Sequence, residues 1–433
     1  MVTSEDPVSL DVILVLQLRT PGDPWLPRLK TFECEEATEA FVPFIPLLLS
    51  PKTTEIKIGF DKSTPTVVAA STIARLSKQC PNLESITLDD LPRDPIITEA
   101  VSEMLLACDR DTLQAFRVDS PLTEEAREVV YRLPRLSRLW AVIQGPTSLP
   151  AVALPNLTMI DVDYDDLNWL QGFRGATLEK LESVTFYSES EKICDPLGTF
   201  ESVALAASAQ NTLSELRFFT PRSWNPNYSP LLSFHQLTAV VILFCCGDGC
   251  SSRVDDDIIM SMARAMPKLE TLQLGDPPCD TPTGITVNGL ISLARLWPRL
   301  SELRIHFQAA TLVEAVTSPT AQSPSDGEPV VRREDCALTD LEVGRIPIPA
   351  GSELIIAHML LQIFPRILNV KDYKYVDQGW RTIADAINDF RRIGTFVHHT
   401  GEAHPTRIYV MIPADMHPGN ALTVRDPLWD GHG

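Results

Sequence analysis

Three cysteines, Cys245, Cys246 and Cys250, form the densest group of metal-binding side-chain types in the sequence. They lie in the run Cys-Cys-Gly-Asp-Gly-Cys, and Cys279 follows further along the chain. A structural zinc site needs four ligands and commonly has paired Cys-x-x-Cys spacings, and this run has neither. Adjacent cysteines at the end of a strand, pointing to opposite faces, explain the run equally well, so no metal is predicted here.

Alternating aspartates at Asp161, Asp163 and Asp165 are similar to the start of a calcium-binding loop. Such a loop requires glycine at its sixth position and glutamate at its twelfth. Here the sixth position is Asp166 and the twelfth is Gly172. The pattern therefore favours a solvated end of a strand over a calcium site.

Three histidines near the C-terminus, His398, His399 and His404, are the remaining candidates for metal binding or proton transfer. Both roles need a further organised group beside the ring, and the tail around them offers none. The sequence also lacks a phosphate-binding Gly-Lys-Ser/Thr loop, a nucleophile elbow and a paired-histidine zinc motif. We therefore expect no enzyme, no metal and no cofactor.

The composition limits the classes of partner. Lys and Arg number 37 against 57 Asp and Glu, which gives a formal net charge of −20 and a pI of about 4.8. Nucleic-acid binding depends on clustered positive charge, so nucleic acid is not expected as the partner. Nine scattered cysteines are typical of a reducing compartment. No signal peptide and no membrane-spanning run are recognised, so we expect a cytoplasmic or nuclear protein without a membrane partner.

A repeated leucine pattern supplies the elements that must position any site. In Met-Pro-Lys-Leu-Glu-Thr-Leu-Gln-Leu, which ends at Leu274, residues Leu272 and Leu274 share one face of a strand. Thr271 and Gln273 face the other way. A helical pattern at residues 254–265 precedes this strand, so helix, turn and short strand form one unit.

The same pattern recurs along most of the chain. Clear copies begin at Leu83, Leu113, Leu136, Leu157, Leu181, Leu213, Leu237, Leu269, Leu300 and Leu338, and weaker ones at Leu29, Ile56 and Ile367. The mean spacing from Leu83 to Ile367 is about 28 residues, within the range of leucine-rich repeats. The spacing varies from 21 residues (Leu136 to Leu157) to 38 (Leu300 to Leu338), which places insertions in loops.

Helical patterns precede the strands at residues 66–79, 96–107, 122–132, 200–209, 255–265, 287–297 and 353–364, and a last amphipathic helix is predicted at residues 376–392. Residues 7–18 fit a helix or a strand, and we favour a helix because prolines and a glycine follow it. Asp255, Asp256 and Asp257 open one helix, where carboxylates complement the positive end of its dipole. Residues 408–412 are a possible edge strand.

The strands are apolar on one face only, which decides between two α/β architectures. A doubly wound sheet, covered on both faces, needs continuously apolar strands. A polar second face means helices on one side, so the sequence predicts a leucine-rich-repeat solenoid, horseshoe-shaped, with a parallel concave sheet and helices on the convex side. We expect the solenoid at residues 7–392, a flexible insertion at 317–335 and a partly disordered tail at 393–433.

The polar face of that sheet is the predicted binding surface for a protein partner. Its candidate residues are Arg117, Arg138, Trp140, Asp161, Tyr187, Arg217, Phe219, Gln273, Arg304 and His306. Several belong to types enriched at interface hot spots. The outward run Ala239, Val241 and Leu243 is too apolar for bare water, so we expect a loop or a partner to cover it.

The Pro-x-Leu-x-x-Leu-x-Leu repeats, as in Cys-Pro-Asn-Leu-Glu-Ser-Ile-Thr-Leu ending at Leu88, resemble those of F-box/leucine-rich-repeat proteins. The run Trp-Leu-Pro-Arg-Leu-Lys-Thr-Phe from Trp25 and the run Gly-Trp-Arg-Thr-Ile-Ala-Asp-Ala-Ile-Asn-Asp-Phe from Gly379 resemble the ends of expanded F-box families in mushroom-forming fungi. The resemblance covers about residues 7–392.

In that family an N-terminal F-box docks on the adaptor of a cullin–RING ubiquitin ligase, and the repeats hold the substrate. The run from Leu10 to Val15 resembles the first turn of an F-box, but nothing like its other helices follows, so we expect the docking module to be missing. The resemblance implies a substrate-recognition part of a ubiquitin ligase receptor. The alternative is a free-standing scaffold or decoy without coupling to a ligase.

Overall fold

A computed structural model of the chain describes residues 26–143, 154–164, 178–187, 210–220, 228–244, 254–275, 284–317, 336–343, 348–372 and 378–399. The chain forms two units, Met1–Asn388 and Asp389–Gly433. In the second unit, the described residues belong to the end of one helix, where Arg392 forms an ion pair with Asp389. The sheet and its core belong to the first unit.

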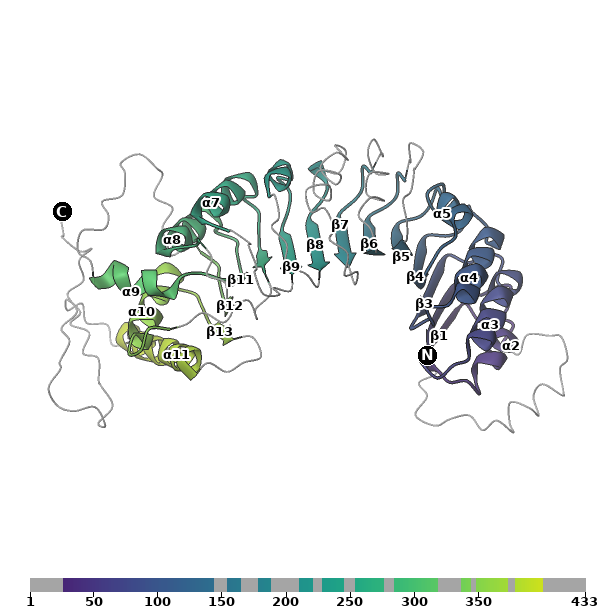
Figure 1. The fold of residues 1–433 in the computed structure, drawn as a ribbon, viewed down its shortest axis with the longest axis horizontal. Helices are drawn as coiled ribbons and strands as arrows, with labels where there is room; N and C mark the ends of the chain where they lie inside the picture. The colour runs from purple at the N-terminus through teal and green to yellow at the C-terminus, as the bar shows by residue number, and fades with distance from the viewer. Residues whose placement is uncertain are drawn as a thin grey trace. The chain divides into compact units, whose positions relative to one another are not determined.

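Thirteen strands within the described part of the first unit form one parallel sheet, in which each strand pairs with its neighbours in the sequence (Figure 1). They are β1 (Thr31–Ala37), β2 (Glu55–Phe60), β3 (Ser85–Asp89), β4 (Ala115–Pro121), β5 (Arg138–Ile143), β6 (Met159–Tyr164), β7 (Ser183–Tyr187), β8 (Glu215–Thr220), β9 (Ala239–Phe244), β10 (Thr271–Leu274), β11 (Glu302–Ile305), β12 (Asp340–Val343) and β13 (Asn369–Asp372). A doubly wound sheet would change strand order, so this topology confirms the repeat solenoid.

Helices connect many of these strands. They are η1 (Val42–Phe44), α2 (Ile45–Leu48), α3 (Thr66–Gln79), α4 (Pro95–Ala107), α5 (Glu124–Val130), η4 (Ser229–Ser233), α7 (Asp256–Ala265), α8 (Val287–Leu296), α9 (Ala309–Thr317), α10 (Glu353–Ile363) and α11 (Gln378–His399). Figure 1 shows α3, α4, α5, α7 and α8 along one side of the strands. Parallel strands need such crossovers. Within the described ranges, these five helices lie on one side of the sheet, opposite its second face.

The leucine pattern forms the core between sheet and helices. The first leucine of each clear repeat, from Leu83 to Leu338, is at most 2% exposed, as is Ile367. The two apolar strand positions that follow are also buried, as Leu272 and Leu274 illustrate in β10. Each repeat alone offers too little apolar surface to offset the entropy of ordering its backbone. Stacking joins these positions into one continuous core.

A ladder of hydroxyl groups fixes the stacking of successive repeats. In six repeats the residue after the first leucine is Ser or Thr, and its hydroxyl donates to a backbone carbonyl of the preceding repeat at 2.9–3.2 Å. These residues are Ser137, Thr158, Ser214, Thr238, Ser301 and Thr339. The same carbonyls accept backbone N–H groups, as that of Gln114 does from Ser137 and Arg138. The hydroxyl therefore adds a bond where each strand begins.

The helix predictions hold where the structure describes the chain, with small shifts at the ends. Helix α3 spans the predicted residues, and Pro95 extends α4 by one residue because proline is tolerated at the first helical position. Helix α11 continues beyond the predicted end at Arg392 to His399. Helix α9 and the short η1, α2 and η4 were not predicted from the sequence. The predictions for residues 7–18, 200–209, 318–335 and 408–412 lie outside the described residues.

Among the helices of the described ranges, none is both long enough and apolar enough to cross a membrane.

Candidate functional site: the polar face of the sheet

The register of the sheet places one outward residue of every strand in a single row. This middle row reads Glu33, Lys57, Thr87, Arg117, Trp140, Asp161, Thr185, Arg217, Val241, Gln273, Arg304, Glu342 and Lys371. The side chains immediately before and after each of these positions on β2 to β12 point to the opposite face and belong to the core. The face that carries the middle row is the polar face.

The polar face brings together most of the residues predicted to bind a partner. Six of them stand in the middle row: Arg117, Trp140, Asp161, Arg217, Gln273 and Arg304. Arg138 precedes Trp140 by two residues on β5 and is exposed, and Tyr187 and Phe219 pair with each other two positions beyond the middle row. His306 follows β11 and is only 7% exposed, so it adds little to this surface.

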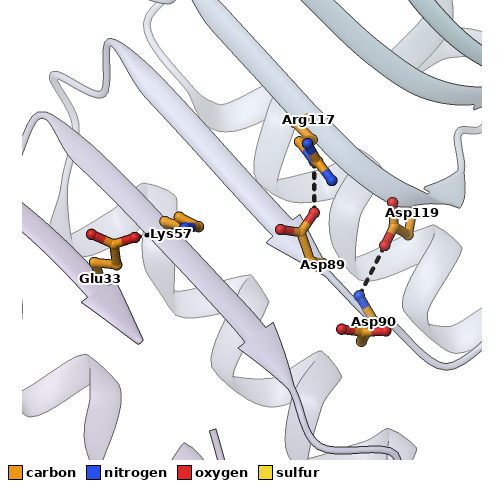
Figure 2. A network of polar contacts seen from close by, with 6 residues as sticks. All are labelled: Glu33, Lys57, Asp89, Asp90, Arg117 and Asp119. Carbon is orange, nitrogen blue, oxygen red and sulfur yellow. Dashed lines mark hydrogen bonds and ion pairs between the residues drawn. The ribbon is translucent and has the colours of Figure 1, made fainter. Parts of the chain in front are cut away.

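Ion pairs link neighbouring strands at the N-terminal end of the polar face, as Figure 2 shows. Lys57 Nζ lies 2.6 Å from Glu33 Oε1, and Arg117 Nε lies 2.7 Å from Asp89 Oδ1. The hydrogen bond that Lys57 donates to Glu33 raises the pKa of the Lys57 ammonium. Because both cations are about two-fifths exposed, each pair adds little to stability and mainly fixes the positions of the charges.

The other described cations of the middle row are matched in the same way. Arg217 pairs with Glu215 on its own strand. Arg304 Nε lies 3.5 Å from Glu342 Oε1. Lys371 Nζ lies 3.6 Å from Asp340 Oδ1. The chain thus supplies a carboxylate for each cation of the middle row.

An aromatic stack crosses the middle of the polar face. The guanidinium carbon of Arg117 lies 3.3 Å from the ring centroid of Trp140. The Trp140 and Tyr187 rings stack with centroids 6.3 Å apart, and the Tyr187 and Phe219 rings with centroids 4.8 Å apart and planes within 5°. Leu243 pairs with Phe219 in the next strand. We call Trp140, Tyr187, Phe219 and Leu243 the aromatic strip; all four are partly exposed.

Two carboxyl groups, on β4 and β6, are partly withdrawn from water. Burial raises the pKa of Asp161, and a hydrogen bond from Thr185 and the charges of Arg117 and Arg217 lower it by less. Burial also raises the pKa of Asp119, whose Oδ2 accepts the backbone N–H of Asp90 at 2.9 Å. Figure 2 shows Asp119 and Asp90 beside Asp89. A positive group from outside the chain would interact favourably with these carboxylates.

Metal binding gains no support from the described residues. In the ranges that the structure describes, no group of three His, Cys, Asp or Glu side chains is placed to hold a metal ion. Asp161 and Asp163 lie in β6, and His398 and His399 belong to α11. The cysteine run at 245–250, the remaining aspartates of the calcium-like pattern and His404 lie outside the described residues.

The three consecutive aspartates at the start of α7 have the structural role that their position predicts. Asp255 caps the helix by accepting the N–H of Ile258 at 2.9 Å. Asp256 accepts two hydrogen bonds from Thr286 in the next repeat, from its N–H at 2.9 Å and its hydroxyl at 2.6 Å. Asp256 therefore also joins two repeats, which the dipole argument alone does not predict.

One contact of the polar face carries no signal in the sequence. Arg93, in the segment between β3 and α4, lies 3.7 Å from Asp163 of β6. The two residues belong to different repeats, and no spacing rule relates them. Since Arg93 is 65% exposed, the pair is weak, but it places a cation near the aromatic strip.

The comparisons with known proteins do not indicate a function, so the proposed function depends on the geometry of the polar face. No protein-family model and no curated protein matches the chain. A crystal structure of a Bacteroides fragilis protein from a structural genomics consortium is similar at 12% sequence identity and a TM-score of 0.32. The match covers 57% of this chain and 64% of that one, so this chain spans less than two thirds of its length.

Proposed function

We propose that this chain is a protein-interaction solenoid that holds a segment of a protein partner on its polar face. The observation that carries the proposal is the middle row, which continues across thirteen strands opposite the helical layer. Extended outward surfaces of this kind are the usual binding surfaces of repeat proteins. The partly exposed Trp140 and Tyr187, with Arg117 beside them, are of the residue types that dominate protein interfaces.

Binding fits this surface better than catalysis. Arg117, Arg217 and Arg304 are each engaged by a carboxylate of the chain, and such pairs position charge without activating a nucleophile. Acid–base or nucleophilic catalysis needs a reactive group oriented by a base within hydrogen-bond reach. The described polar face offers charge and aromatic surface, which serve recognition.

The resemblance to F-box/leucine-rich-repeat proteins leads to a more specific proposal. The segment held on the polar face is a ubiquitin-ligase substrate, and this chain is the substrate-recognition part of an F-box-type receptor. The alternative is a free-standing scaffold or decoy that binds the same kind of segment without a ligase. The two differ in one partner, the adaptor of the cullin–RING ligase.

Site-specific photo-crosslinking in cells tests the proposed surface. A photoreactive residue is placed at the partly exposed Thr87 or Gln273 of the middle row, or at the exposed Val67 of α3 as the matched control on the helical side. We expect the middle-row positions to capture a common protein and Val67 not to capture it. The capture should be lost after Trp140→Ala combined with a second substitution, Arg217→Ala. Equal capture from Val67 would contradict the proposal.

Co-purification separates the two versions of the function. Recovery of the cullin–RING adaptor with the tagged chain supports the ligase receptor. Recovery of the captured protein without the adaptor supports the scaffold or decoy. The double substitution serves as the control in both cases because it should remove the captured protein and leave adaptor binding unchanged.

A further inference from the structure

The aromatic strip presents apolar surface on a face that is otherwise charged. The Tyr187 ring stacks with those of Trp140 and Phe219, and these three rings and Leu243 all remain partly exposed. Val241, in the middle row beside the strip, is only 7% exposed although it belongs to the polar face. Apolar surface rimmed by charged groups is characteristic of a protein-binding site.

The dimensions of the strip define the size of its occupant. It runs across the strands from Trp140 on β5 to Leu243 on β9, which is four strand spacings. At about 4.8 Å per spacing the strip is about 19 Å long. An extended chain rises about 3.3 Å per residue, so about six residues span it. A short extended segment therefore matches its length.

The charges around the strip select a positive occupant. Asp161 and Asp163 of β6 stand between Trp140 and Tyr187 in the strand order, where the strip has no aromatic residue. Arg117 and Arg217, the nearby cations of the middle row, already pair with Asp89 and Glu215. Arg93, a further nearby cation, lies 3.7 Å from Asp163, but its side chain is 65% exposed, so that ion pair is weak.

The charge of the whole chain favours the same partner. A net charge of −20 attracts basic segments over long range and speeds their association. An acidic segment would meet repulsion both at long range and at β6. Local and global charge thus agree on the sign of the occupant.

We propose that the aromatic strip, with Asp161 and Asp163, docks a short extended segment of a protein partner that carries apolar side chains next to lysine or arginine. The apolar side chains lie against Tyr187, Phe219 and Leu243, and the cation lies at the carboxylates of β6. This inference deepens the proposed function, on which it rests, by stating the chemistry of the partner.

Fluorescence anisotropy of the full chain with labelled synthetic peptide pools tests the inference. The peptides are about eight residues long, slightly longer than the strip. One pool alternates Leu or Val with Lys or Arg, a second replaces the basic residues by Asp or Glu, and a third replaces the apolar residues by Ser or Gly. We expect the basic, apolar pool to bind more tightly than either of the others.

Matched substitutions show whether the strip is responsible. Tyr187→Ala, or Asp161→Asn together with Asp163→Asn, should weaken binding of the basic, apolar pool about tenfold or more. Asp340→Asn together with Glu342→Gln removes the same charge from the polar face at β12 and should leave binding near that of the wild type. Circular dichroism confirms folding of each variant, and the Asn substitutions keep the side-chain size.

Four results would overturn the inference. The acidic or the Ser/Gly pool could bind as tightly as the basic, apolar pool. The β12 pair could weaken binding as much as the β6 pair, which would mean general attraction to an acidic chain. If another pool binds and Tyr187→Ala weakens it, the partner chemistry is wrong but the polar face still binds. If no polar-face substitution affects any bound pool, the proposed function fails as well.

Discussion

The contact between Gly289 of α8 and Asp256 of α7 allows a sharp test of how successive repeats are joined. A Cβ atom added at Gly289 would lie 2.1 Å from Asp256 Oδ1, closer than any real contact of this kind. The carboxylate must then rotate away, but both of its oxygens accept hydrogen bonds from Thr286. Gly289→Ala should therefore lower the free energy of unfolding by the contribution of those two hydrogen bonds.

The magnitude follows from two opposing effects. Hydrogen bonds to a charged acceptor contribute about 1.5 kcal/mol each at the lower end of their range, so losing both costs about 3 kcal/mol. Alanine is a better helix former than glycine by about 1 kcal/mol. Gly289→Ala should therefore destabilise the chain by about 2 kcal/mol. In an Asp256→Ala background the clash is absent, and the same change should stabilise by up to about 1 kcal/mol.

The assay is a double-mutant cycle measured by urea denaturation, with hydrogen exchange of peptides from α7 and α8 as a local readout. Local exchange is needed because repeats of a solenoid can open separately. The coupling free energy between Gly289→Ala and Asp256→Ala should be about 3 kcal/mol. Asp257→Ala is the control, since Asp257 is exposed in the same helical turn. Additive effects of the two substitutions would refute the reasoning, as would equal coupling with Asp257→Ala.

Three further predictions concern the core, the polar face and the thiols. In urea denaturation, Leu272→Ala should lower the free energy of unfolding by about 2–5 kcal/mol, because Leu272 is buried in the core. Gln273→Ala beside it should change the free energy of unfolding by less than about 0.5 kcal/mol. Similar effects of the two substitutions would contradict a one-sided core. Burial raises the pKa of Asp161 above 3.8, so the stability linked to its protonation is lost as pH rises through the folded-state pKa. Asp161→Asn should therefore be at least as stable as the wild type at pH 7, and its advantage in the free energy of unfolding should shrink towards pH 3.8. An advantage that grows at low pH would refute this prediction. Burial raises the pKa of the Cys80 thiol to about 11 and that of the Cys108 thiol to about 12. Iodoacetamide at pH 8 should therefore modify both thiols only after unfolding, because the thiolate is the reactive form. Rapid labelling of these thiols in the native chain would contradict the prediction.

The leucine spacing was sufficient to predict the strands and the row that they form. Side chains alternate along a strand, so Leu272 and Leu274 in the core require Gln273 on the polar face. Repetition of the pattern then predicts that equivalent positions lie side by side, as Arg217, Val241 and Gln273 do. These features follow from a local rule that is applied many times.

Contacts between side chains of different repeats were less predictable, because they depend on how far each side chain reaches across the neighbouring strands. Trp140 and Tyr187 stack although their strands are separated by β6. Arg93 reaches Asp163 across the intervening strands. Neither contact is encoded in the spacing of residues within one repeat, since loop paths and side-chain rotamers decide both.

Short elements were missed for local reasons. Pro43 and Pro46 interrupt the helical sequence pattern at η1 and α2. The structure tolerates these prolines because each lies near the start of its helix. Helix α9 is only nine residues long, and a helix of that length depends on packing against its neighbours. The hydroxyl ladder, by contrast, had a visible signal: Ser or Thr follows the first leucine in six repeats, from Ser137 to Thr339.

Residue-resolved hydroxyl-radical footprinting tests most directly the central claim that one face of the sheet is buried in the core and the other is an open binding surface. It compares the partly exposed Trp140, Tyr187 and Phe219 of the polar face with Phe186 and Phe218 of the core face, in the free chain and with the basic, apolar peptide pool bound. We expect oxidation of Trp140, Tyr187 and Phe219 in the free chain and their protection when the peptide pool is bound. We expect no oxidation of Phe186 and Phe218 in either state. Equal protection of both groups in the free chain would mean that a second layer covers the sheet, and would contradict the account.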